Sequence, residues 1–401
     1  MKRRDILKGV VALPALAGAS TAEAASTVAA PKDYFAELGL RTFINAAGNY
    51  TSMTASLMPP EVMAAIQTSA KKYAMLDDVQ DKVGARIAEL CKAEGAMVTA
   101  GCWSALVLGM AGVLTGMDGK KAAALPFLEE NGMKSEVILQ KTHANGYHKA
   151  LTNAGVKLVL IETKEELEKA ISEKTAMLWF LNREAPEGKI GHEEFVALGK
   201  KHGIPTMIDI AADVPPVENL WKYNVMGFDL VAISGGKALL GPQSAGILMG
   251  RKDLIAAARL NAPPRAGIAR GQKVNKEEII GMLAALERYI HHDHDKDWKT
   301  WEARIRHLKS AVATIKGVYT EDVIPLIANH NPTLKIGWDP SAIKLTRDEM
   351  GKRLREGSPS IETISWEDED SVRVAVFMLQ DGEEKIVAKR IREELLKAQA
   401  S

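Results

Sequence analysis

A lysine and an aspartate that could serve one ligand follow two neighbouring apolar segments. Lys237 lies in the glycine-rich string SGGKALLGPQ, shortly after the apolar run FDLVAI. Asp209, 28 residues earlier, ends the apolar run PTMID. In an open α/β sheet, ligands bind outside the carboxyl ends of the strands. We therefore expect the amine and the carboxylate to lie at adjacent strand ends and to act on the same molecule.

A third group of residues could bind an anion. The string MVTAGCWSALVLGMAG combines a strand, a turn at Gly101 and the start of a helix, and the free N–H groups at a helix N-terminus attract phosphate. Ser104 and Ser234 could each add a hydroxyl. A glycine turn before a helix is common by itself. Followed by the acid and the lysine, it meets the needs of pyridoxal phosphate, which takes a lysine amine on its aldehyde and a carboxylate beside its pyridine nitrogen.

The elements that must position these residues alternate between strand-like and helical periodicity. The expected strands are AMVTA, SEVILQ, KLVLIE, TAMLWFL, PTMIDI, FDLVAIS and AGILMG. Helical patterns separate most of them, which predicts a three-layer α/β fold with a mainly parallel sheet and helices on both faces. AGILMG follows Lys237 too closely for a helical crossover, so we expect it to run antiparallel.

The chain is expected to divide into four segments: a signal peptide over residues 1–24, an N-terminal segment over 25–60, a large ligand-binding domain over 61–270 and a small α+β domain over 271–401. In the small domain, a long helix is predicted to begin near NKEEIIG and to lead into HHDHDKDW. Shorter strands such as TLKIGW and SVRVAVFML follow, and a helix ends the chain.

The N-terminus is typical of an export signal. A basic start with adjacent Arg3 and Arg4, a small apolar stretch and the pattern Ala22-x-Ala24 resemble a twin-arginine signal, which exports folded proteins. A membrane anchor is the alternative, but the apolar run is shorter than the roughly 20 residues of a spanning helix. We predict a soluble mature protein in the periplasm, exported by the twin-arginine machinery.

Composition excludes a nucleic-acid surface. The 401-residue chain has a formal net charge of +1, and beyond residue 24 it carries 48 basic and 49 acidic residues. Nucleic-acid binding would need a basic face. Cys91 and Cys102 are too few for a disulfide framework and lack metal-ligand spacing. We interpret both as packing residues, with a bridge between them as the alternative.

Several strings together resemble one branch of the fold-type-I pyridoxal-phosphate enzymes, the branch of bacterial selenocysteine synthase and D-glucosaminate-6-phosphate ammonia-lyase. The resemblance covers roughly residues 33–398 and is most specific in the lysine loop and the interdomain segment. Four stretches carry it: FINAAGNYT at 43–51, SGGKALLGPQSAGIL at 234–248, GIARGQKVNKEEIIGMLAAL at 267–286 and LREGSPSIET at 354–363. It implies the aspartate-aminotransferase-like fold, with a seven-stranded sheet, a smaller C-terminal domain and at least a homodimer.

The resemblance assigns roles to the residues that hold the cofactor. Lys237 is the lysine that forms the Schiff base, and Asp209 is the partner of the pyridine nitrogen. The phosphate turn comprises Gly101, Cys102 and Ser104, with Ser234 nearby. His143, just after a strand, occupies the place of the side chain that stacks on the cofactor ring. Its alternative interpretation is a solvated loop histidine.

Three basic residues match positions at which relatives hold a substrate anion: Arg355, Arg270 and Lys273. A guanidinium suits the two oxygens of a carboxylate. Each of the three could instead be a surface charge.

The resemblance implies an amino-acid substrate whose α-proton is removed by the freed lysine. Loss of a β-substituent would then release ammonia and a keto acid; β-replacement, racemisation and aldol cleavage are the alternatives. The chain lacks the tRNA-gripping N-terminal domain of selenocysteine synthase, and a cytoplasmic sugar phosphate fits an exported enzyme poorly. We therefore favour an ammonia-lyase acting on a hydroxy-amino acid or amino-sugar acid.

Other functions are weaker interpretations. HHDHDKDW, residues 291–298, offers three histidines, but no matching ligand set appears elsewhere, so we predict a polar helix surface and no metal. A nucleotide-binding P-loop is disfavoured because no G-x-x-x-x-G-K-[ST] string occurs. A cofactor-binding or anion-binding protein without catalysis would keep the fold, but intact Asp209 and Lys237 argue against it.

Overall fold

The computed structural model describes residues 32–365 and 371–399. The chain divides into two compact units, residues 1–42 and 43–401. In the first, the described residues form one short helix, α1 (Tyr34–Glu37), capped by the Asp33 carboxylate. The predicted signal peptide lies outside the described residues. Among the residues that the structure describes, no helix is both long and apolar enough to cross a bilayer.

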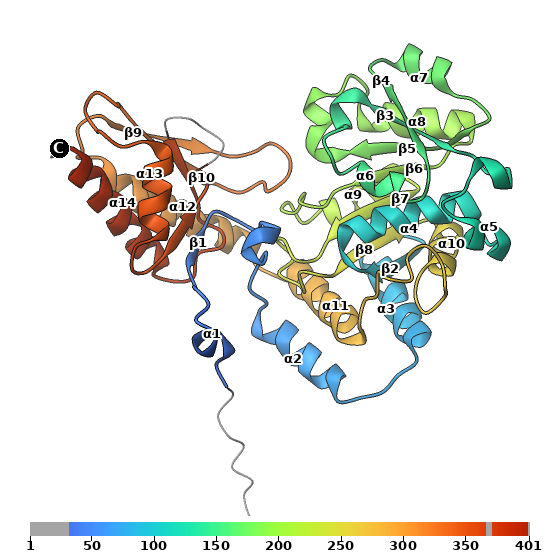
Figure 1. Ribbon diagram of the computed structural model, residues 1–401, viewed down its shortest axis with the longest axis horizontal. Coiled ribbons are helices and arrows are strands. Elements are labelled where there is room, and N and C mark those ends of the chain that lie inside the picture. The colour runs from blue at the N-terminus through green and yellow to red at the C-terminus, as the bar shows by residue number, and fades with distance from the viewer. Residues whose placement is uncertain (1–31, 366–370, 400–401) are drawn as a thin grey trace, which may run out of the picture. The chain divides into compact units, whose positions relative to one another are not determined.

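The second unit is built on a seven-stranded sheet (Figure 1). From edge to edge, its strands are β2 (Gly95–Thr99), β8 (Gly246–Gly250), β7 (Leu230–Ser234), β6 (Thr206–Asp209), β5 (Thr175–Leu181), β3 (Glu136–Gln140) and β4 (Lys157–Ile161). All run parallel except β8, which is antiparallel to both of its neighbours. The predicted antiparallel strand is thus confirmed. All seven residues of β5 are buried, as expected for a parallel strand covered on both faces.

Helices cover both faces of this sheet, and each layer has its own apolar core (Figure 1). One layer comprises α4 (Gly101–Thr115), α5 (Gly119–Ala124), α6 (Lys149–Thr152) and α10 (Lys252–Asn261). The other comprises α2 (Pro60–Ala70), α3 (Leu76–Leu90), α7 (Lys164–Ala170), α8 (His192–His202), α9 (Asn219–Met226) and α11 (Lys276–Ile290). This is the predicted three-layer α/β architecture.

A smaller antiparallel sheet follows, in the order β12 (Ser371–Ala375), β10 (Thr333–Trp338) and β9 (Val318–Val323). It shares an apolar core with α12 (His294–Val312), α13 (Arg347–Arg355) and α14 (Glu383–Gln399). A parallel pair joins β1 (Ile44–Ala46) to β11 (Ile361–Thr363), so the segment before the large sheet is tied to the C-terminal part of the chain. The sequence pattern did not predict this pairing.

The string HHDHDKDW interrupts a helix instead of continuing one. α11 ends at Ile290, and the Asp293 carboxylate accepts the Lys296 N–H at the start of α12. Two of the histidines are bound locally: His292 Nε2 lies 2.8 Å from Asp297 Oδ2, and His294 Nε2 lies 2.8 Å from the Tyr289 carbonyl oxygen. No group of three or more His, Cys, Asp or Glu side chains within 32–365 and 371–399 is arranged to hold a metal ion.

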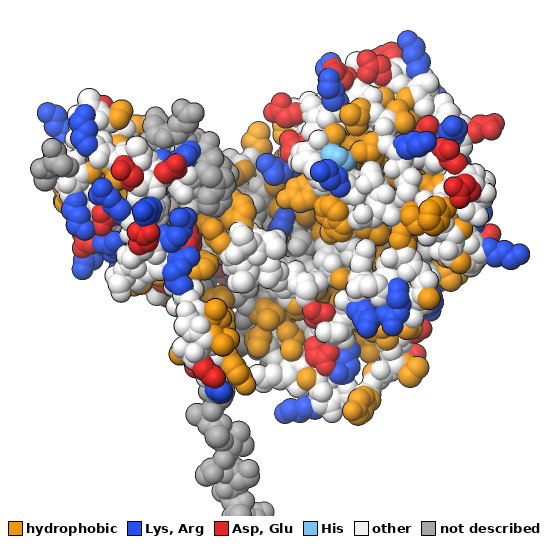
Figure 2. All heavy atoms as spheres, viewed as in Figure 1, with side chains coloured by type: hydrophobic (Ala, Val, Ile, Leu, Met, Phe, Trp, Pro, Cys, Tyr) orange, Lys and Arg blue, Asp and Glu red, His pale blue; other side chains and the backbone are white. Residues whose placement is uncertain are grey.

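The surface agrees with the balanced composition. On the face shown in Figure 2, Lys and Arg side chains are interspersed with Asp and Glu side chains.

One close backbone approach joins the sheet to α4. A Cβ on Gly246 of β8 would lie 2.5 Å from the Gly101 carbonyl carbon and 2.7 Å from the Cys102 nitrogen. Gly101 itself has φ +79°, a conformation that glycine adopts without strain. Glycine at position 246 therefore brings the start of α4 directly against the edge of β8.

We expect Gly246→Ala to lower the free energy of unfolding by about 1–3 kcal/mol, because the added methyl group must displace backbone atoms. Gly119→Ala is the matched control, since a Cβ there meets nothing within 4 Å. Urea denaturation of both variants measures the difference. Equal stability of the two variants would show that the contact between β8 and α4 tolerates a side chain.

Candidate active site

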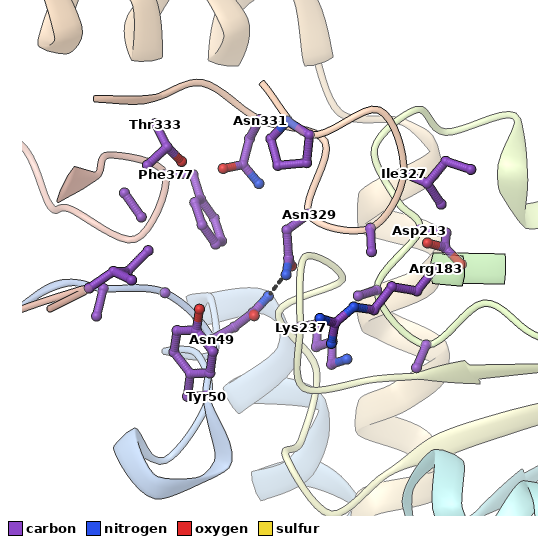
Figure 3. Close-up of a pocket in the computed structure, with 18 of the residues that line it drawn as sticks. Asn49, Tyr50, Arg183, Asp213, Lys237, Ile327, Asn329, Asn331, Thr333 and Phe377 are labelled. Carbon is purple, nitrogen blue, oxygen red and sulfur yellow. Dashed lines mark hydrogen bonds between the residues drawn. The ribbon is translucent and has the colours of Figure 1, made fainter. Parts of the chain in front are cut away.

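A cavity of about 590 Å³ opens at the carboxyl ends of β5, β6 and β7 (Figure 3). Three stretches of the chain and Tyr147 line it. Residues 47–51 come from the segment after β1, the strand ends contribute residues between 181 and 237, and residues between 323 and 377 come from the small sheet and its loops. Asn49 Nδ2 donates to Asn329 Oδ1 at 3.3 Å, which links the first stretch to the third. The cavity lies where the strand-end rule predicts a ligand.

Lys237 reaches this cavity because the loop after β7 folds back on itself. The Gly235 N–H donates to the Ala245 carbonyl at 2.8 Å, and the Gly241 N–H donates to the Gly235 carbonyl at 2.9 Å. A Cβ on Gly236 would lie 2.5 Å from the Gln243 Cα, so no larger residue fits without a shift. The glycines around the lysine therefore allow a loop compact enough to hold the amine at the strand end. No ion pair involves Lys237 within the described residues.

Asp209 is the last residue of β6 and lines the same cavity with only 3% of its surface exposed. Its Oδ1 accepts the Ala211 N–H at 2.9 Å, and the Cys102 Sγ lies 3.6 Å away as a thiol donor. Burial raises the pKa of Asp209, while the Ala211 N–H and the charge of Lys237 act in the opposite direction. A buried carboxylate of this kind is stabilised by a nearby cation.

The phosphate turn precedes this acid along the chain and lies beside it. α4 begins at Gly101, and its first N–H groups have no partners within the helix. Ser104 is 2% exposed, and its hydroxyl oxygen has no hydrogen-bond partner. Burial and the charge of Asp209 raise the pKa of the Cys102 thiol well above its ordinary value, so Cys102 is a neutral donor here. Ser234 ends β7 opposite Gly246, whose backbone touches Gly101.

His143 does not take the predicted place. Its ring is fully buried and is not among the groups that line the cavity. Its Nδ1 accepts the Leu181 N–H at 3.2 Å, and its edge meets the Phe180 ring. Burial lowers the pKa of His143 to about 4. A neutral ring held in this way stabilises the end of β5, and it offers no face to a ligand in this cavity.

The three predicted anion-binding residues also lie outside the cavity of this chain. Arg355 Nε donates to both carboxylate oxygens of Glu362, at 3.0 and 3.1 Å, so it is bound within the small domain. Arg270 and Lys273 are exposed on the segment before α11. Within this chain none of the three is brought into the cavity, and their binding of a substrate anion stays a prediction.

Two other arginines line the cavity instead: Arg183, two residues beyond β5, and Arg373, in β12. The strand-end rule that identified Asp209 could also have identified Arg183. Arg373 gives a weaker signal, a charged residue within the apolar strand SVRVA.

A second acid, Asp213, was missed as well. It lines the cavity four residues after Asp209, with 2% of its surface exposed. Its Oδ1 has no hydrogen-bond partner. Burial raises the pKa of Asp213 to about 7, and the nearby charge of Asp209 adds to the shift. The sequence signal that could have identified Asp213 is its place in IAADVPP, directly after strand β6.

Comparison with known proteins agrees with this geometry. The SelA family, L-seryl-tRNA selenium transferase, matches residues 137–316. D-glucosaminate-6-phosphate ammonia lyase of Salmonella typhimurium is 28% identical over 375 residues, 90% of this chain and 97% of that protein. A 5'-C-glycyluridine monooxygenase-decarboxylase of a Streptomyces species is 26% identical over 340 residues, 82% of this chain and 83% of that protein.

A solved structure of D-glucosaminate-6-phosphate ammonia-lyase matches this chain with a TM-score of 0.80 and 26% sequence identity. The match covers 92% of this chain and 99% of the chain in that structure. The chain is a pyridoxal-phosphate enzyme of fold type I. It lies in the branch that holds the selenium transferases and this ammonia lyase. The relatives are named for different reactions, so similarity alone does not identify the reaction of this chain. The residues of the cavity must be considered for that purpose.

The residues present fit pyridoxal phosphate. The unpartnered Ser104 hydroxyl and the open start of α4 suit the phosphate group. Buried Asp209 suits the protonated pyridine nitrogen, and Lys237, in the same cavity, suits the aldehyde. With the cofactor bound, the start of α4 would hold its phosphate, Asp209 would face its pyridine nitrogen and Lys237 would supply the amine.

The pH dependence of stability tests the environment of Asp213. Because its pKa is about 7 in the folded protein and near 3.8 in an ordinary carboxyl, the folded state binds more protons and stability falls as pH rises through this range. Asp213→Asn removes that loss. Between pH 5 and pH 8, the stability of the variant relative to wild type should rise by about 2 kcal/mol.

Denaturation curves at the two pH values measure this change, with Asp118→Asn as the control. The pKa of Asp118 is lowered by the N–H groups of Lys120 and Lys121, so this exposed carboxyl is ionised throughout the range. Its variant should show no pH-dependent difference from wild type. A flat difference for Asp213→Asn would mean that Asp213 is already ionised at pH 5.

Proposed function

We propose that this enzyme is a lyase that eliminates a β-substituent from a hydroxy-amino acid or amino-sugar acid and releases ammonia and a keto acid. The observation that carries the proposal is one cavity lined by Lys237, Asp209, Arg183 and Arg373. A lysine and an acid hold the cofactor, and arginines suit the carboxylate of an amino acid. The similarity to D-glucosaminate-6-phosphate ammonia lyase over 97% of that protein supports the same class of reaction.

Polar residues of the opposite wall support a hydroxylated substrate. Asn49, Asn331 and Thr333 line the cavity together with Asn329. Amide and hydroxyl groups both donate and accept hydrogen bonds, which suits the hydroxyl groups of a sugar acid or a hydroxy-amino acid. The cavity volume of about 590 Å³ also lies in the ordinary range for a cofactor or small-molecule site.

Each residue has a separate task in this reaction. Pyridoxal phosphate, when bound, would supply an electron-accepting ring for the charge that develops at the substrate's α-carbon. Asp209 would keep the pyridine nitrogen protonated, and the turn at Gly101 would hold the phosphate. The Lys237 amine would hold the cofactor in the resting enzyme and, when free, would remove the substrate's α-proton at Nζ. Arg183 orients the substrate through its carboxylate.

β-Replacement is the second candidate, and the match to the selenium transferase family favours it. Both reactions share removal of the α-proton and loss of the β-group, and they differ in whether a nucleophile then adds. Product analysis with and without an added thiol or selenide separates them.

We also propose that the active enzyme is a homodimer or a larger assembly. Trp103, in the first turn of α4, is 43% exposed next to the phosphate turn. Exposed Arg270 and Lys273 are free to reach a second copy. Coverage of these residues by a neighbouring subunit would explain an aromatic side chain at the surface beside a binding site.

Export to the periplasm by the twin-arginine route remains our proposal for the location of the protein. It rests on the sequence of residues 1–24 alone. Fusion of this segment to a reporter protein, compared with a variant in which Arg3 and Arg4 are lysine, tests it. A reporter exported equally well by both would contradict the proposed route.

The reaction is tested by a screen of D- and L-3-hydroxy-2-amino acids and of amino-sugar acids, in which ammonia and keto-acid release are both measured. Wild type should release the two products in equal amounts from at least one of them. Lys237→Ala should release neither, because it lacks both the attachment point of the cofactor and the base. Release of a keto acid without ammonia would contradict an ammonia-lyase.

Arg183→Lys tests substrate binding. A lysine keeps the charge but loses the planar fork, so KM should rise about 10-fold or more, in line with the ~1.5–3 kcal/mol of a hydrogen bond to a charged group. Arg355→Lys is the control, because Arg355 is bound to Glu362 away from the cavity. Steady-state kinetics of both variants measure the effect. A larger rise for Arg355→Lys would restore the sequence-based assignment.

A further inference from the structure

We propose that Asp213 is a second catalytic acid of this cavity, which donates a proton to the oxygen that leaves the β-carbon of the substrate. The inference rests on the proposed elimination and adds a residue to it. Elimination of a hydroxyl group needs such a donor, because hydroxide is a poor leaving group and water is a good one. No other residue of the cavity has yet been given this task.

The backbone around Asp213 holds the carboxyl in place. The Asp213 N–H donates to the Ile210 carbonyl at 3.2 Å, and Asn219 Nδ2 donates to the Asp213 carbonyl at 2.6 Å. The Asn329 N–H donates to the Ala212 carbonyl at 2.7 Å, which joins this turn to the segment before β10. The side chain is thus fixed where the strand ends meet the opposite wall. Figure 3 shows Asp213 among the residues that line the cavity.

Burial favours the protonated form of Asp213, and the groups that face it act in both directions. Asp209 and Tyr223 are the neighbouring groups that carry negative charge when ionised, and Lys237 is the neighbouring cation. The Asn182 side chain and the Ala328 N–H lie against the carboxyl and favour the anion. Asn182 is itself bound to Tyr223 and His192, at 2.9 and 2.6 Å. Burial outweighs the favourable contacts, and Oδ1 keeps no partner.

The two buried acids differ in their hydrogen-bond partners and therefore in the roles that we assign to them. Burial raises the pKa of both. Asp209 has the Ala211 N–H and the Cys102 thiol as donors, and it would face the cationic nitrogen of a bound cofactor. Asp213 Oδ1 has no partner, so its carboxyl can donate a proton into the cavity. Two carboxyls in different surroundings can act as one anion and one acid.

The proton and the electrons balance in this step. Removal of the α-proton leaves an electron pair at the α-carbon, and this pair forms the double bond to the β-carbon. The bond from the β-carbon to oxygen breaks, and its electron pair leaves with the oxygen. The proton of the Asp213 carboxyl moves to that oxygen, so the group departs as water. The Asp213 carboxylate is then protonated again from solvent, and no oxidant or reductant is needed.

Two probe substrates distinguish this role from a structural one. Asp213→Asn should lower elimination from serine by about 100-fold or more, the usual contribution of a positioned acid. Elimination from 3-chloroalanine should stay within about threefold of wild type, because chloride leaves without a proton. Exchange of the α-proton in D2O should also stay within about threefold. Both enantiomers of each probe are used.

Asp209→Asn is the contrasting variant, since it should lose exchange and both eliminations together. A loss of equal size on serine and 3-chloroalanine in Asp213→Asn would overturn the proposal, because Asp213 would then act through the cofactor or the fold. Undiminished elimination from serine would overturn it as well.

An infrared readout on the cofactor-free protein tests the same residue without catalysis. The wild-type minus Asp213→Asn difference spectrum should contain the carbonyl stretch of a protonated carboxyl at pH 6, and this band should vanish well above pH 7. A carboxylate band at pH 6 would overturn the proposal. Wild-type protein that shows the protonated band but neither exchange nor elimination with either probe would refute the proposed function, and with it the role of Asp213.

Discussion

The ends of two adjacent parallel strands hold a carboxylate and an amine in one cavity, and the chemistry of the site depends on that arrangement. β6 ends at Asp209, which pairs in register with Ala232 of β7. After β7 ends at Ser234, two glycines lead to Lys237. Burial of Asp209 disfavours its charge, and the Ala211 N–H and the lysine oppose that effect. The protonated pyridine nitrogen of a bound pyridoxal phosphate would lower the cost of burying the Asp209 charge further.

Close backbone contacts make this arrangement specific. The turn at Gly101 lies directly on Gly246, and the lysine loop closes on Ala245 and Gln243. Because backbone meets backbone at these points, side-chain adjustment cannot relieve a larger residue. These contacts place the start of α4, β8 and the lysine loop next to one another.

The sequence predicted the parts of the site that follow from strand ends, and it failed where side chains are directed by tertiary contacts. The apolar runs, and the glycines and polar residues that end them, predicted four features: Lys237, Asp209, the turn at Gly101 and the antiparallel β8. His143 has the right position after β3, but its ring turns inward to accept the Leu181 N–H. Arg355 matched a motif, yet Glu362 holds it outside the cavity. Pattern reasoning places a residue along a strand, and packing decides which way it points.

The central claim is that Lys237 is the attachment point of pyridoxal phosphate. The most direct measurement is the absorption spectrum of purified residues 25–401, beside Lys237→Ala, before and after borohydride reduction, followed by peptide mapping. The account predicts a band near the violet edge of the visible range in wild type, which borohydride converts into a stable adduct on Lys237, and no such adduct in the variant. Wild-type protein that gives no band with added pyridoxal phosphate, or an adduct on another lysine, would contradict it.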